Sequence, residues 1–133
     1  MNLRTEDPSE TGFQHGIWLF NEGHFFDAHE VLEDVWRAEA GARRGFLQAL
    51  VQAAVGLHHY STGNLIGARS VLERSARNLE PYGEHCGGVA AGALRRELLA
   101  FRAQLHDLRA GDSLRELSLP RIVLLPEPPA ARC

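Results

Sequence analysis

A histidine and a glutamate stand four residues apart in the segment 23–36, whose sequence is GHFFDAHEVLEDVW. Residues four apart share one side of an α-helix, so His29 and Glu33 can meet there. Such a pair can supply a nitrogen and an oxygen ligand to Zn²⁺ or a similar divalent ion. Without a metal, the carboxylate can fix the imidazole tautomer, and the pair can act as an acid and base in hydrolysis.

A second set of polar residues lies on the most apolar predicted helix, residues 45–62. Gln48, Gln52 and His59 fall on one line of that helix, and burying them is costly unless they find partners. If helix 24–38 packs on this line, its histidine and glutamate become those partners. The predicted inward-facing cluster comprises His29, Glu33, Gln48, Gln52 and His59, with Trp36 as its wall.

Three interpretations of this cluster stay open. His29, Glu33 and His59 can form a divalent metal site, for example for Zn²⁺. The same residues can line a metal-free pocket in which the glutamines bind a small polar ligand. The third interpretation is a structural hydrogen-bond network that fixes the register of the helices. His58 projects elsewhere and is expected to be ordinary, and His24 is expected to cap a helix.

The elements that must position these residues are all helical. An Asp-Pro-Ser-Glu start at residue 7 and a Gly23 stop predict a helix from Pro8. Apolar spacing of 3.6 residues predicts four more, at 24–38, 45–62, 65–80 and 89–110. The Pro-rich segment 117–133 is predicted to run extended along the bundle through Ile122 and Leu124, and to be partly disordered.

An internal repeat with a period of 40 residues underlies this pattern. The segment 23–33, GHFFDAHEVLE, aligns with the segment 63–73, GNLIGARSVLE. Each copy follows a helix with a glycine turn and a second helix, so we expect two repeated hairpins within one compact bundle. Positions shared by both copies are those that a hairpin of this shape needs in order to fold.

Length and composition favour a single domain over residues 1–133, with a flexible segment 1–6. Residues 1–40 carry nine acids and two arginines, and residues 41–133 carry eight acids and twelve arginines. This charge asymmetry allows a self-complementary homodimer but does not favour nucleic acid. No apolar run is long enough for a membrane span, and the N-terminus does not resemble a signal peptide. We therefore expect a cytoplasmic protein with reduced thiols and no membrane partner.

Two further features allow chemistry outside the cluster. Cys86, beside His85, is either an ordinary loop cysteine or a reactive thiol in a mobile loop. Arg95, Arg102 and Arg109 flank one helix, either as a solvated edge or as a site for an anionic partner.

The residues Phe25–Glu30, Leu32, Glu33 and Trp36 resemble the hallmark of the family called domain of unknown function 309. Further similarity lies at Phe46–Gln48, Gln52, His59, Gly63–Asn64, Gly67–Ala68 and Leu119–Ile122. The resemblance implies a small prokaryotic all-helical bundle and no established activity. It also marks Glu30, which points away from the predicted core, so a site role for Glu30 would require a groove or a second subunit.

Two functions follow as hypotheses. The first is a non-catalytic binding or interaction module. The second is a metal-dependent or acid–base enzyme, hydrolytic in type, with His29 and Glu33 as its catalytic candidates and His59 as a further ligand.

Overall fold

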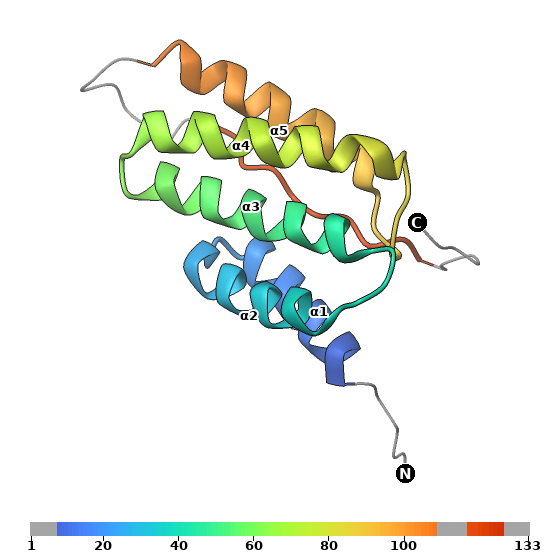
Figure 1. Cartoon of the computed structure of the whole chain (residues 1–133). Coiled ribbons are helices and arrows are strands. Elements are labelled where there is room, and N and C mark those ends of the chain that lie inside the picture. Colours follow the sequence, from blue (N-terminus) through green and yellow to red (C-terminus); the bar gives the residue numbers. More distant parts are fainter. Residues whose placement is uncertain (1–7, 109–116, 127–133) are drawn as a thin grey trace.

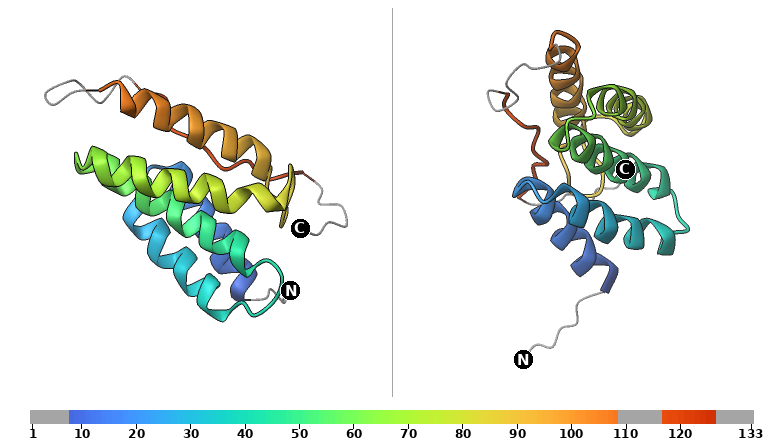
Figure 2. Two further views of the ribbon diagram at one scale, coloured as in Figure 1. Left: turned by 45° about the horizontal axis from the view of Figure 1, so that its top comes forward. Right: turned by 90° about the vertical axis from the view of Figure 1, so that its left-hand side faces the viewer.

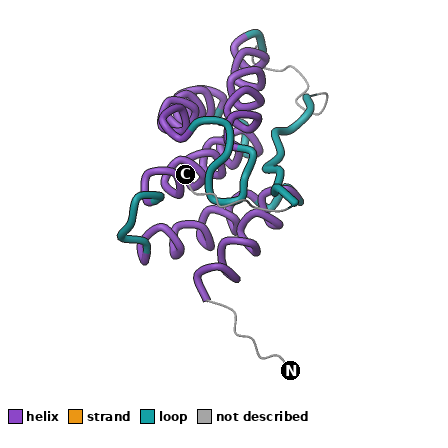
Figure 3. Tube along the Cα trace, turned by 90° about the vertical axis from the view of Figure 1, so that its right-hand side faces the viewer, coloured by secondary structure: helices purple, strands orange, loops and turns teal. Residues whose placement is uncertain are grey.

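The computed structural model describes residues 8–108 and 117–126 of the 133-residue chain (Figure 1). Their regular structure consists of α1 (Pro8–Asn21), α2 (Phe25–Ala38), α3 (Arg44–Ser61), α4 (Leu65–Leu79), a 3₁₀ helix η1 (Glu80–Tyr82) and α5 (Ala91–His106). Figure 3 shows helices and loops over these residues. The predicted all-α class with five helices is confirmed. The start at Pro8 is confirmed as well, while its predicted capping residue lies outside the described residues.

Helix α3 occupies the centre of the bundle. It packs against α2 on one side and against α4 on the other, and α4 in turn packs against α5 (Figures 1 and 2). Half of its residues are buried, among them Phe46, Leu50 and Leu57, as its nearly continuous apolar surface predicts. No helix in the described parts of the chain combines the length and apolarity that crossing a membrane requires.

The backbone hydrogen bonds at the two turns show the predicted repeat. At the end of α1, the Gly23 N–H donates to the Phe20 carbonyl and the His24 N–H donates to the Leu19 carbonyl. Forty residues later, Gly63 and Asn64 make the same two bonds at the end of α3. Both are Schellman motifs, and both glycines have φ near +86°, at +86° and +87°. A glycine is required there because other residues are strained at positive φ.

The helices of each hairpin also approach one another at an equivalent glycine. A Cβ placed on Gly16 would lie 2.6 Å from the Leu32 side chain, and one on Gly56 would lie 2.7 Å from the Leu72 side chain. The two leucines are fully buried. In each hairpin, a glycine of the first helix therefore leaves the space that a leucine of the second helix fills.

The two hairpins differ in how their second helices are capped. The Asn64 side chain accepts a hydrogen bond from the Gly67 N–H at 2.9 Å. His24 holds the same position before α2 but makes no capping hydrogen bond through its side chain. The prediction that His24 caps a helix is therefore correct for its position and wrong for its side chain, which is left for other contacts.

The segment 117–126 runs extended and joins the first hairpin to α5. The Asn21 side chain donates to the Ile122 carbonyl at 2.9 Å and accepts from the Ile122 N–H at 2.8 Å. Ile122 is buried, as predicted, but Leu124 is exposed, which corrects that part of the prediction. The backbone of Leu124 instead forms an isolated β-bridge with Val89, which leaves its side chain facing outward.

Candidate functional site

The predicted pair of His29 and Glu33 forms on α2. His29 Nε2 lies 3.2 Å from Glu33 Oε1, and the other carboxylate oxygen accepts a hydrogen bond from Arg37 Nη2 at 3.1 Å. Their side chains are 25% and 28% exposed, so the pair sits at the edge of the core rather than inside it. This geometry lets Glu33 orient the imidazole ring, but water reaches both groups.

The remaining polar residues of the predicted cluster do not join this pair. The Asn78 side chain of α4 donates to Gln52 Oε1 at 2.9 Å, and the amide nitrogen of Asn64 lies 3.3 Å from His59 Nδ1. Gln48 is exposed. The predicted inward-facing cluster therefore does not form, because Gln52 and His59 face α4 and the residue before it, and Gln48 faces solvent.

The three residues predicted as metal ligands do not come together either. Among the described residues, no three His, Cys, Asp or Glu side chains are arranged to hold a metal ion. His29 and Glu33 lie on the α2 side of α3, whereas His59 contacts the residue that precedes α4. A pair of ligands without a third leaves a divalent ion mostly in water.

Trp36 does not form the wall of a polar cluster, and Glu30 does not line a pocket with it. The Arg44 guanidinium lies 4.4 Å from the centre of the half-buried Trp36 ring, and Arg44 Nη1 donates to the Trp36 carbonyl. Trp36 thereby helps to fix the connection between α2 and α3. Glu30 is exposed, as its angle on the helix predicts.

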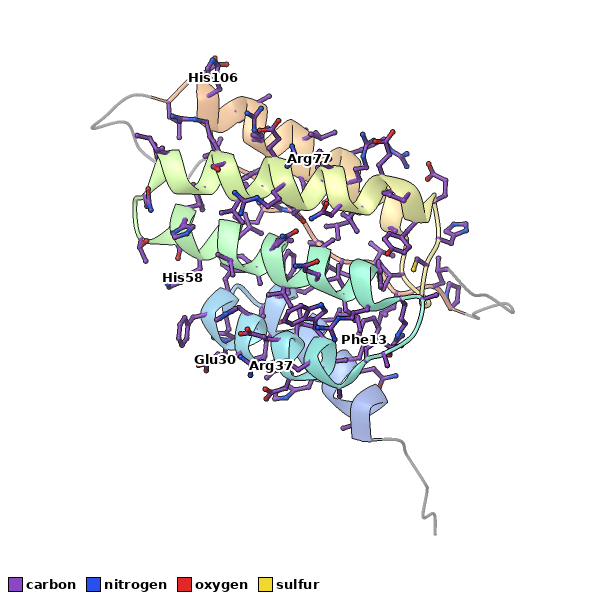
Figure 4. All side chains as sticks on the ribbon, in the orientation of Figure 1. Phe13, Glu30, Arg37, His58, Arg77 and His106 are labelled. Carbon is purple, nitrogen blue, oxygen red and sulfur yellow. The ribbon has the colours of Figure 1, made fainter. Side chains whose placement is uncertain are left out.

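His58, expected to be ordinary, lies against α2. Its ring centre is 5.3 Å from that of Phe26, and the ring of His29 lies 5.6 Å from Phe26 on the same helix. Phe26 remains 49% exposed although it is a large apolar residue. Figure 4 shows His58 at the same end of the molecule as Glu30 of α2.

A second exposed aromatic residue, Trp18, lies in α1. Trp18 is 55% exposed, and its ring lies 6.4 Å from that of His15 and 6.3 Å from that of His24. His24 also lines a shallow hollow of about 240 Å³ together with Phe26, Asp27 and His58. We call this surface the aromatic–histidine patch; its members are His15, Trp18, His24, Phe26, His29 and His58.

Sequence reasoning missed most of this patch. Trp18 and Phe26 are apolar residues on helices with apolar faces, and such residues are usually assigned to the core. The repeat holds a usable signal, because Trp18 and His58 occupy equivalent positions in the last turns of α1 and α3. Two residues of such different chemistry at equivalent positions indicate a place that folding does not constrain.

Two of the α5 arginines singled out by the sequence contact α4. Arg95 Nε donates to the Ala76 carbonyl and Arg102 Nε donates to the Arg69 carbonyl, both on α4. Arg102 also lies 3.6 Å from Glu73. These contacts attach α5 to α4; Arg109 lies outside the described residues.

Cys86 does not provide a reactive thiol. It is buried and disulfide-bonded, so the expectation of reduced thiols is wrong at this position, and so is the alternative of a reactive thiol. Cys133 lies outside the described residues.

Comparison with known proteins gives a match to one family profile and no activity. Residues 13–71 match the sequence profile of the family described as "Domain of unknown function (DUF309)". An uncharacterized protein of Aquifex aeolicus is 27% identical over 82 residues, which are 61% of this chain and 25% of that protein. The uncharacterized protein YpuF of Bacillus subtilis is 32% identical over 57 residues, 42% of this chain and 33% of that protein. The chain therefore spans between a quarter and a third of these relatives.

Proposed function

We propose a function from the surface of the molecule: a non-catalytic protein-interaction module. The DUF309 profile that residues 13–71 match, as the motif residues lead us to expect, carries no activity. The docking surface of the module is the aromatic–histidine patch. The observation that carries the proposal is the exposure of two large aromatic rings, Trp18 and Phe26, each beside two histidine rings.

The energetics of exposed aromatic residues support a docking role. A tryptophan and a phenylalanine that stay half in water leave unused much of the burial energy that they could supply. Such residues dominate binding when a partner covers them. The histidine rings beside them add polar edges, which can hydrogen-bond a partner around the apolar contact.

The charges around the patch indicate the chemistry of the partner. Asp27 lines the hollow, and Glu22 and Glu30 are exposed on its border. None of these three carboxylates forms an ion pair within the described residues. A partner surface that combines an apolar anchor with a basic side chain fits this arrangement.

The test compares truncations inside and outside the patch. Phe26→Ala and Trp18→Ala should each weaken binding of a partner captured by the wild type by at least about tenfold, measured by calorimetry with purified components. Leu99→Ala, an exposed leucine on α5, is the matched control and should bind like the wild type. Equal affinities for all four proteins would contradict the patch as the docking surface.

The geometry of His29 and Glu33 favours a second candidate, an acid–base hydrolase. The contact of 3.2 Å gives His29 the oriented imidazole that a general base needs. Ester hydrolysis by the wild type that is lost in His29→Gln and kept in His15→Gln would support this candidate. Equal rates in both variants would exclude a role for the pair.

A further inference from the structure

We infer that the partner of the aromatic–histidine patch is a second copy of the chain. The inference rests on the proposed function and names its partner. The two copies meet at the ends that carry the turns α1–α2 and α3–α4, related by a two-fold axis. In this dimer the hollow beside Phe26 contacts a second hollow, described next, of the other copy, and the same contact occurs twice.

The second hollow lies at the start of α4. It has a volume of about 360 Å³ and is lined by Gly63, Asn64, Leu65, Ile66, Arg69 and Leu108. Ile66 is 75% exposed, the highest value among the large apolar side chains described as exposed. Apolar residues held this far into water favour a covering partner.

The internal repeat makes the two hollows equivalent in the backbone. The equivalent pairs are Gly23 and Gly63, His24 and Asn64, Phe25 and Leu65, and Phe26 and Ile66. Both hollows flank the C-terminal end of α3, because one includes His58 and Ser61 and the other includes Gly63. The right-hand view of Figure 2 looks at this end of the molecule.

The hollows differ in charge in a complementary way. Asp27 lines the first and Arg69 lines the second, and neither forms an ion pair among the described residues. The second hollow thus offers the apolar anchor and basic group that the patch requires of its partner. A surface with both complementary halves on one end of the molecule is suited to a two-fold interface, in which residue i contacts residue j and j contacts i.

The two charges allow a test by exchange. Asp27→Arg should place two arginines at each of the two contacts, and Arg69→Asp should place two acids there. Each variant alone should be monomeric at concentrations where the wild type dimerises, with the dissociation constant raised more than about 100-fold. Equal amounts of the two variants should form a dimer, since both contacts again pair opposite charges. Analytical ultracentrifugation measures all four samples.

Controls separate this geometry from general charge effects. Asp34→Arg on α2 and Arg77→Asp on α4 make the same charge changes away from the hollows and should dimerise like the wild type. Arg69 also donates to the Leu105 carbonyl at 3.3 Å, so its replacement can affect folding. Ile66→Asp is the second acidic variant, since the exposed side chain of Ile66 has little part in packing. It should pair with Asp27→Arg more tightly than either variant pairs with itself, because one contact then has the wild-type charges and the other sets the introduced arginine against the introduced aspartate.

A monomeric wild type at all concentrations, or a dimer that both hollow variants leave intact, would overturn the inference. A mixture of Asp27→Arg with each acidic variant that stays monomeric would overturn it too. These results leave the proposed function standing if Phe26→Ala still loses a different partner. A different result would reject the proposed patch: Asp27→Arg loses the dimer, but Phe26→Ala and Trp18→Ala still bind the second copy, and any other partner, as tightly as the wild type does.

Discussion

The hairpins α1–α2 and α3–α4 close with the same two backbone bonds, at 3.0 and 2.9 Å in the first and at 3.0 and 2.8 Å in the second. They differ in what surrounds them. The second hairpin is covered by α2 on one side and by α5 on the other, whereas the main helical neighbour of α1 in the described part of the chain is α2. Equivalent positions with unlike residues, such as Trp18 and His58, therefore report on surface roles, and positions with like residues report on folding.

The largest effect should come from filling the glycine contact of each hairpin. A Cβ on Gly56 would lie 2.7 Å from the Leu72 side chain and 3.3 Å from the Leu72 backbone nitrogen, whereas Gly16 meets side chains alone. Gly56→Val should lower the free energy of unfolding by about 3 kcal/mol and Gly16→Val by about 1–2 kcal/mol, since a backbone yields less than a side chain. Urea denaturation measures both, and the reverse order would show that the first hairpin is the more tightly packed.

Alanine at the two turn glycines should have nearly equal effects. Gly23 and Gly63 have φ of +86° and +87°, and no atom lies near a Cβ added at either position. Each substitution to alanine should therefore cost about 1–2 kcal/mol from backbone strain alone. Thermal unfolding of both variants and of the double variant tests this equivalence. A difference of more than about 1 kcal/mol between the single variants would contradict it.

A buried serine breaks the likeness between the hairpins. Ser75, fully buried on α4, donates to the Ala49 carbonyl of α3 at 2.7 Å, whereas its equivalent in α2 is Val35. Ser75→Ala should lower the free energy of unfolding by about 1 kcal/mol through loss of this hydrogen bond. Ser70→Ala, exposed on the same helix, is the control and should change it by less than about 0.5 kcal/mol. If chemical denaturation gave the same free energy of unfolding for Ser75→Ala and Ser70→Ala, the Ser75 hydrogen bond would have no specific stabilising role.

The smallest effect is expected at the shared glutamates. Glu33 pairs with His29 and Arg37, and its equivalent Glu73 lies 3.9 Å from Arg77 and 3.6 Å from Arg102. Because all these groups reach water, Glu33→Gln and Glu73→Gln should each change the free energy of unfolding by less than about 1 kcal/mol. A buried structural network would instead make Glu33→Gln cost about 1–3 kcal/mol. Melting curves of both variants decide between the two.

Much of the fold could be predicted because it is encoded locally. Helical periodicity located the five helices, and glycines at C′ positions located both Schellman turns. The apolar faces of α1, with Phe13, Ile17 and Phe20, and of α3 are buried as predicted. The repeat could also be read from residues 23–33 and 63–73, and the equivalent glycines in α1 and α3 extend it into the helix contacts.

The candidate site could be predicted only in part. The contact between His29 and Glu33 forms because both residues belong to one helix, whose pitch sets their separation. The other half of the cluster required knowing which helix covers Gln52 and His59. An angle on a helical wheel assigns residues to a side of α3 but does not say whether α2 or α4 packs there.

The sequence by itself determined the helices, their turns, the buried faces and the repeat, since each depends on residues less than about two turns apart or on a visible copy. Tertiary structure alone decided that α4 covers the glutamine side of α3, that His58 meets Phe26, and that Trp18, Phe26 and Ile66 stay exposed. The physical reason is that exposure depends on the neighbouring helices, and the order of packing is a property of the whole chain.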